Sequence, residues 1–161
     1  MIVVSNTSPI TNLAAVHQLP LLQQLYGIVV IPQAVYDELT GVSKSVAGST
    51  EVQTLAWIQT QKVANEVLVT ALELELDPGE AEAIALAIEL KADLLLLDER
   101  RGRTVASHFG VKFIGILGVL IEAKHKGVIS EVKPALDDLI LTAGFWVTRP
   151  LYTRVLQTVG E

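Results

Sequence analysis

The chain of 161 residues contains no cysteine. This absence excludes disulfide bonds, catalysis by a thiol and a zinc site built on cysteine. It is also typical of proteins that work in a reducing compartment, so we expect a cytoplasmic location.

Charge is scarce as well. Only 19% of the residues are charged and 50% are apolar, a balance that argues against disorder and predicts that part of the apolar surface is covered in a homodimer. The net charge of −6 argues against a general nucleic-acid coat protein, which is normally basic. It does not argue against an enzyme that brings RNA or DNA to an acidic pocket neutralised by metal.

The segment 2–36 lacks Lys, Arg, Asp and Glu altogether, as a membrane anchor would. However, no basic region precedes it, and polar residues and prolines such as Asn6, His17 and Pro20 interrupt it. We therefore expect a soluble protein without a membrane partner.

Several catalytic motifs are also missing. The chain has no GxGxxG, GxxxxGK[ST] or GxSxG motif, so nucleotide-binding loops and serine hydrolases lack support. Its three histidines, at positions 17, 108 and 125, are scattered and form no HExxH pair.

Short apolar runs alternate with segments of helical periodicity along the whole chain. This alternation predicts an α/β fold with three layers, α/β/α, around a central parallel sheet, and we expect residues 1–161 to form a single domain. Strands are expected at 2–5, 28–31, 94–97, 111–114 and 145–148, and a strand followed by a short helix at 66–76. Helices are expected from Ser8 onward and at 19–26, 32–40, 52–58, 81–90, 101–109, 115–126, 131–143 and 150–158. The stretch 42–49, rich in Ser, Gly and Val, predicts a mobile loop.

Four polar residues stand where a predicted strand ends or within a predicted helix that follows one. They are Asn6 after the first strand, Glu38 in the helix begun by Pro32, Glu80 in a first helical turn, and Asp98 after four leucines. Such positions gather at one edge of an α/β sheet, where active sites usually lie. Clustered carboxylates repel one another, so the pattern favours a divalent cation that holds them together.

Each of these residues also has a simpler interpretation. Asp98 can cap the following helix, and Glu80 can complement a helix dipole. Glu38 and its neighbour Asp37 can form a solvated face, while Asn6 can make an Asx turn. Taken singly, the residues leave both interpretations open.

The residues after Asp98 offer further candidates. Glu99 is either a second ligand or a solvated carboxylate of a first helical turn. Arg101 and Arg103 are candidates for contacts with phosphate groups, although a solvated helix start explains at least one of the arginines here.

Four segments resemble a known family in their order and spacing: 2–10, 31–39, 79–84 and 96–99. They are similar to the PIN domain, a metal-dependent nuclease fold that includes the VapC-type toxins. The tail, 127–145 with Leu151 and Tyr152, resembles an uncharacterised prokaryotic PIN subfamily, so the resemblance spans nearly the whole chain.

The resemblance implies a catalytic site that binds Mg²⁺ or Mn²⁺ and cleaves RNA, leaving a 5′-phosphate and a 3′-hydroxyl. Its catalytic and metal-binding residues would be Asn6, Glu38, Glu80 and Asp98, with Thr7 or Ser8 as a supporting hydroxyl. PIN enzymes typically carry Asp at the position of Asn6. The neutral amide removes one unit of charge, so weaker metal binding and impaired activity are expected.

The resemblance also implies partners, namely an RNA substrate and, for a toxin of a toxin–antitoxin pair, an antitoxin protein. The alternative is a degenerate PIN domain that binds RNA or protein without cleaving it. A third reading, an α/β phosphatase or small-molecule hydrolase, needs an Asp nucleophile after the first strand, and Asn6 argues against it.

Overall fold

The computed structural model describes residues 1–41 and 46–161. At its centre is a five-stranded sheet in which every pair of neighbours is parallel, in the order β3-β2-β1-β4-β5. The strands are β1 (Val3–Ser5), β2 (Val29–Pro32), β3 (Ile58–Gln61), β4 (Leu94–Leu96) and β5 (Phe113–Ile114).

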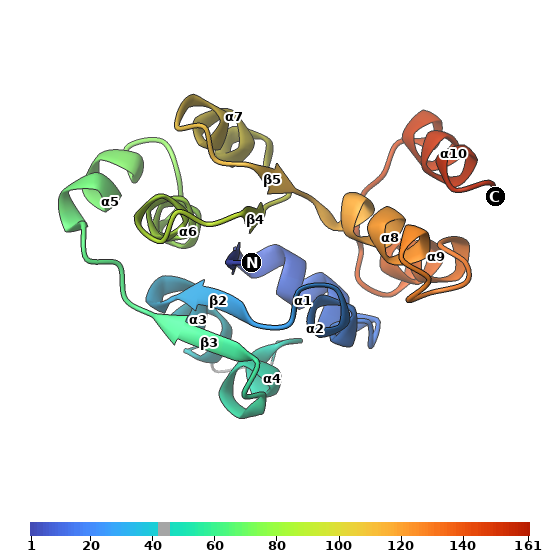
Figure 1. Cartoon of the computed structure of the whole chain (residues 1–161), viewed down its shortest axis with the longest axis horizontal. Helices are drawn as coiled ribbons and strands as arrows, with labels where there is room; N and C mark the ends of the chain where they lie inside the picture. The colour runs from blue at the N-terminus through green and yellow to red at the C-terminus, as the bar shows by residue number, and fades with distance from the viewer. Residues whose placement is uncertain (42–45) are drawn as a thin grey trace.

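Helices cover both faces of this sheet (Figure 1). One face carries α1 (Thr7–Ala15), α2 (Pro20–Tyr26), α8 (Ile116–His125), α9 (Lys133–Leu141) and α10 (Arg149–Thr158). The other carries α5 (Glu66–Leu72), α6 (Pro78–Glu89) and α7 (Arg100–His108). Near β2 and β3 lie α3 (Gln33–Thr40) and α4 (Ser49–Thr54). The predicted three-layer α/β/α fold is confirmed.

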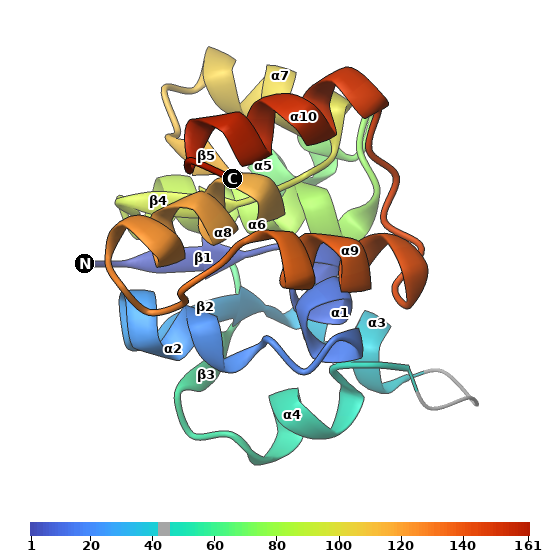
Figure 2. The ribbon, with the colours of Figure 1, turned by 90° about the vertical axis from the view of Figure 1, so that its right-hand side faces the viewer.

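The central strands are buried on both faces, as expected for a parallel sheet between helical layers. Val3 packs into the core beneath α1 and α8, whereas its neighbour Val4 packs into the core beneath α6. Leu94 and Leu95 alternate in the same way. Figure 2 looks onto the face covered by α8, α9 and α10. No helix in the described parts of the chain is both long and apolar enough to cross a membrane.

Three of the predicted elements were wrong. Residues 66–72 form α5 rather than a strand, because Asn65 caps this helix by accepting a hydrogen bond of 3.1 Å from the backbone N–H of Leu68. The helix predicted at 52–58 ends at Thr54, and Ile58 begins β3. This edge strand has one buried residue and three exposed ones, so it carries no clear strand pattern.

The third wrong element is the strand predicted at 145–148. The structure has no strand there: Phe145 and Val147 pack as single side chains against the core, and Thr148 caps α10. Smaller differences concern helix starts. Asn6, not Ser8, is the N-cap of α1. Of the loop predicted at 42–49, residues 42–45 lie outside the described residues.

The strand order has its switch point at β1, which pairs with β2 on one side and with β4 on the other. At such a point the connections leave in opposite directions and a crevice opens at the carboxyl ends of the strands. The backbone N–H of Asn6 donates to the carbonyl oxygen of Leu96 at 3.0 Å, so the ends of β1 and β4 are held together there. The fold thus brings the residues that follow these two strands to one edge.

Candidate active site

Asn6 occupies the N-cap position of α1, yet its side chain makes no capping hydrogen bond. The residue is only 4% exposed. An Asn in this position normally satisfies the first turn of its helix. The capping role therefore does not explain this side chain, and its carbonyl oxygen is available to a ligand.

Glu38 reaches Asn6 from α3. The hydroxyl of Thr7, one residue after Asn6, donates a hydrogen bond of 2.8 Å to Oε2 of Glu38. This bond links the start of α1 to α3 and fixes the orientation of the carboxylate. Of the two hydroxyls expected to support the site, those of Thr7 and Ser8, the Thr7 hydroxyl contacts Glu38.

Gly79 marks the point where three side chains converge. A Cβ atom on this glycine would lie 2.8 Å from Oε2 of Glu38 and 3.5 Å from Oδ1 of both Asn6 and Asp77. The absent side chain leaves a space surrounded by oxygen atoms. Such a space, with two carboxylates and one amide around it, has the donor chemistry that hard cations prefer.

A cavity of about 400 Å³ opens over these oxygens. The polar residues that line it include Asn6, Thr7, Ser8, Glu38, Asp77 and Glu99. The hydroxyl of Ser8 is buried there, with no hydrogen-bond partner among the described residues. The cavity is therefore acidic, and within residues 1–41 and 46–161 its lining contains no basic side chain.

Glu80 lies in the first turn of α6 and is only 8% exposed. Its Oε2 atom is buried and has no hydrogen-bond partner in the described part of the chain. Burial, followed by the neighbouring Asp77 and more weakly Glu99, raises the pKa of Glu80 to about 7. A solvated carboxylate that merely complements a helix dipole would not be buried in this way.

Asp77 was not among the residues predicted for the site. It is the N-cap of α6 and accepts a hydrogen bond of 2.8 Å from the backbone N–H of Glu80. The signal was present in the sequence, since Asp followed by Pro, Gly and Glu is a typical helix start. This cap places the Asp77 carboxylate between Glu38 and Glu80.

Asp98 follows β4 and is held from two sides. Its Oδ1 atom accepts a hydrogen bond of 3.1 Å from the backbone N–H of Ile116 and lies 3.6 Å from Nη2 of Arg103. Its Oδ2 atom is buried and accepts no hydrogen bond from any described residue. Burial raises the pKa of Asp98, although the Ile116 N–H and Arg103 oppose this effect. Asp98 does not cap the helix that follows it, because the N-cap of α7 is Glu99.

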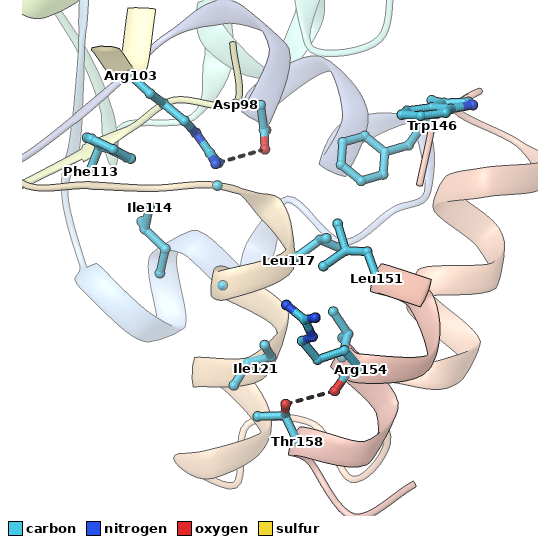
Figure 3. A pocket seen from close by; sticks show the side chains of 14 residues that line it. Asp98, Arg103, Phe113, Ile114, Leu117, Ile121, Trp146, Leu151, Arg154 and Thr158 are labelled. Atoms are coloured by element: carbon cyan, nitrogen blue, oxygen red, sulfur yellow. Dashed lines mark hydrogen bonds and ion pairs between the residues drawn. The ribbon is translucent and has the colours of Figure 1, made fainter. Parts of the chain in front are cut away.

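The two predicted arginines have different places. Arg103 points toward Asp98 (Figure 3), donates through Nε to the carbonyl oxygen of Leu97 at 2.9 Å, and lies 5.5 Å from the centre of the Phe113 ring. Arg101 donates to the carbonyl oxygen of Glu75 at 3.1 Å and lines neither cavity beside the acidic residues. Of the two, only Arg103 is brought to the site.

The predicted residues therefore meet in two adjoining groups. Asn6, Glu38 and Thr7 share the acidic cavity with Glu99, and Glu80 adjoins it through Asp77. Asp98 opens instead into a second cavity of about 570 Å³. No three Asp, Glu or His side chains among residues 1–41 and 46–161 are already close enough to hold one metal ion.

The donor set nevertheless fits a divalent cation. All the polar side chains at this edge except Arg103 offer oxygen, and the buried oxygens of Glu80 and Asp98 have no other partner. Buried carboxylate oxygens without partners are rare and call for an unseen ligand or a proton. Oxygen-only donors of this kind suit Mg²⁺ or Mn²⁺ rather than zinc.

Comparison with known proteins identifies one family. The model of the DUF3368 family, described as a PIN domain, matches residues 2–161. A search of curated proteins finds no match to the chain.

Proposed function

The chain belongs to the PIN-domain family, and on that premise we propose that it is a ribonuclease dependent on Mg²⁺ or Mn²⁺. PIN domains are generally nucleases, so a phosphodiester hydrolase is the expected class of enzyme. The observation that carries the proposal is the pair of buried carboxylate oxygens without partners, Oε2 of Glu80 and Oδ2 of Asp98, at the same edge of the sheet as Glu38.

In this proposal Asn6, Glu38, Glu80 and Asp98 would hold the metal. The bound ion would supply an activated water molecule and stabilise the charge that develops on the phosphate. Thr7 orients Glu38 through its hydrogen bond, and Asp77 fixes the first turn of α6, which carries Glu80. Arg103, held against Asp98, offers a guanidinium to the phosphate group of the substrate.

Cleavage of a labelled RNA in Mg²⁺ or Mn²⁺ tests the proposal. Glu38→Gln removes a ligand charge and should abolish cleavage. Gly79→Ala should also abolish it, because the new methyl group would fill the space between Glu38, Asn6 and Asp77. Alanine favours a helix over glycine by about 1 kcal/mol, so this variant should remain folded.

The matched control is Glu73→Gln, which removes the same charge from an exposed position. It should cleave RNA like the unaltered protein. Failure of the unaltered chain to cleave any RNA in either metal, with Asn6→Asp equally inactive, would rule out the ribonuclease.

A second candidate function is a degenerate PIN domain that binds RNA or protein without hydrolysis. It is favoured by the neutral side chain of Asn6. It is also favoured because no three carboxylates among the described residues lie close enough together to hold one metal ion. Binding of RNA without any metal-dependent cleavage would select this alternative.

We also propose that the ribonuclease is the toxin of a type II toxin–antitoxin pair, acts as a homodimer and works in the cytoplasm. A small antitoxin reading frame beside the gene would support the toxin role, and its absence would count against it. Light scattering at micromolar concentration tests the dimer, and a strictly monomeric mass would contradict it.

A further inference from the structure

We propose that the second cavity beside Asp98 binds a single strand of RNA, with a base stacked on Trp146 and the phosphate backbone held by Arg154 and Arg103. The inference rests on the proposed function, because it states where the RNA substrate of the proposed ribonuclease would bind beside the candidate active site. It adds a binding groove, formed by β5, α8 and α10, that the acidic residues do not provide.

The groove adjoins the site through Asp98. Asp98 and Arg103 line one end of it, and Leu151 and Arg154, from α10, line the opposite wall (Figure 3). Leu117 and Ile121 of α8 form its floor. Its volume of about 570 Å³ exceeds that of the acidic cavity, so it has room for more than one nucleotide unit beside the scissile bond.

Trp146 supplies a stacking surface. It lies in the connection between α9 and α10, lines the groove and is 81% exposed. Packing within the chain does not explain so large an exposed aromatic side chain. Aromatic side chains beside a basic groove are the usual platform for the bases of single-stranded nucleic acid, because every base has a face that can stack.

The charge of the groove complements a phosphate backbone. Arg154 is exposed, and among the described residues no carboxylate lies within ion-pair distance of it. Among residues 1–41 and 46–161, Asp98 is the only acidic residue in the lining, and it is already paired with Arg103. A groove with two guanidinium groups is unusual on a chain of net charge −6.

The neighbouring acidic cavity has the opposite character. Its lining includes Glu38, Asp77 and Glu99, and no basic side chain belongs to it among the residues that the structure describes. A strand of RNA laid in the groove would therefore place phosphates on the arginines and present the next phosphate to the carboxylates and their cation. Most of the groove lining is apolar and suits the faces of bases, whereas its two guanidinium groups suit phosphates. This combination favours RNA over a wholly apolar protein segment, which would leave the guanidinium groups without partners.

Binding can be measured without cleavage by titrating the full chain with a labelled octanucleotide of uridine in EDTA and following fluorescence anisotropy. Trp146→Ala and Arg154→Ala should each weaken binding by about tenfold, the scale expected for loss of one stacked base or one backbone contact. The binding constant should fall as salt rises, and less steeply for Arg154→Ala than for the unaltered chain.

The matched control is Arg149→Ala, on the same helix but outside the groove lining. It removes the same charge and should change affinity by less than about twofold if the groove is specific. The tryptophan fluorescence of the unaltered chain should be quenched by the RNA. In Trp146→Phe, which retains Trp57, the quenching should disappear.

Cleavage in Mg²⁺ or Mn²⁺ separates the two proposals. If the unaltered chain cleaves RNA while Trp146→Ala and Arg154→Ala bind and cleave like Arg149→Ala, the RNA-binding role of the groove is ruled out. The ribonuclease proposal is then supported. If the RNA binds and quenches Trp146 but is never cleaved, RNA binding in the groove is supported and the ribonuclease activity is ruled out. The RNA-binding role of the groove is ruled out if saturating RNA leaves Trp146 fluorescence unquenched. It is also ruled out if Trp146→Ala and Arg154→Ala still bind RNA normally and lose only the binding of a protein.

Discussion

The carboxylate of Glu82, on α6, accepts a hydrogen bond of 3.0 Å from the backbone N–H of Ala34 in the first turn of α3. Glu38 lies one helical turn further along α3, and Glu80 lies two residues before Glu82 on α6. One side chain therefore caps the helix that carries Glu38 and ties it to the helix that carries Glu80.

Glu82→Ala should separate positioning from ligand binding. Loss of the cap should lower the free energy of unfolding by about 0.5–2 kcal/mol. RNA cleavage should fall by about tenfold, because a misplaced catalytic group is costly even when the chemistry is intact. Glu82→Gln keeps the hydrogen-bond acceptor and should restore most of the activity. Equal losses in both variants would show that the charge, not the cap, matters.

Glu80→Gln should change how stability depends on pH. The pKa of Glu80 is raised in the folded protein to about 7 from 4.5, so the unfolded chain loses its proton first as pH rises. The metal-free protein should therefore lose stability between pH 4.5 and 7, and the variant should escape this loss.

Urea unfolding in EDTA at several pH values measures the effect. The variant should gain on the order of 1–3 kcal/mol over the unaltered protein near neutrality, with no difference below the unfolded pKa. Glu73→Gln, an exposed change, serves as the control. Parallel stability curves for Glu80→Gln and the unaltered protein would contradict the prediction.

Asn6→Asp should strengthen the metal site. It restores one negative charge without changing the size of the side chain, so the affinity for Mg²⁺ or Mn²⁺ should rise, as hard cations respond to ligand charge. Calorimetric titration measures the affinity, and a labelled-RNA assay should show increased cleavage. Asp98→Asn in the same background should abolish it. If neither metal binding nor cleavage changes, the result favours the alternative of a degenerate PIN domain that binds RNA or protein without hydrolysis.

Glu161→Gln should destabilise the protein far from the candidate site. Glu161 accepts hydrogen bonds from the backbone N–H groups of Val132 and Lys133, and its carboxylate lies 2.9 Å from Nζ of Lys124. The Val132 hydrogen bond is the main reason that its pKa is lowered to about 2. Its contribution is therefore present above pH 4.5 and is lost as pH falls toward 2.

The midpoint of thermal unfolding near neutral pH checks this prediction. It should be lower for Glu161→Gln than for the unaltered chain, and the difference should shrink in acid. The control is Glu131→Gln, a change at an exposed side chain that makes no hydrogen bond to any other described residue. A loss of the same size in the control would remove the role assigned to Glu161.

The sequence was most informative where local pattern and tertiary packing agree. The four leucines before Asp98 are all buried, and three of them form the interior strand β4. Because both faces of this strand are covered, its apolar run predicts the strand clearly. The edge of the sheet and the segment around Phe145 carry no such clear pattern. Ile58 begins a strand with three exposed residues, and the apolar residues around Phe145 pack without joining the sheet.

The site was predictable as a set of carboxylates but not as a geometry. The sequence places Asp98 after a strand, but only the fold reveals that the N–H of Ile116 and the guanidinium of Arg103 hold its Oδ1 atom. The sequence around Asp77 indicates its local role as a helix cap. It does not indicate that Asp77 lies close to Glu38, because this closeness depends on how α3 and α6 pack. Arg101 lies near Asp98 in sequence, yet the helix turns it toward Glu75.

Two helices begin at the acidic edge and donate backbone N–H groups to its carboxylates: α6 through Glu80 to Asp77, and α8 through Ile116 to Asp98. The amino end of a helix carries roughly half a positive charge, which offsets part of the repulsion among the acids. The chain can therefore fold around its carboxylates before any cation arrives. For the proposed ribonuclease, chelation should consequently abolish cleavage while the protein stays folded, in contrast to small zinc domains that unfold without their ion.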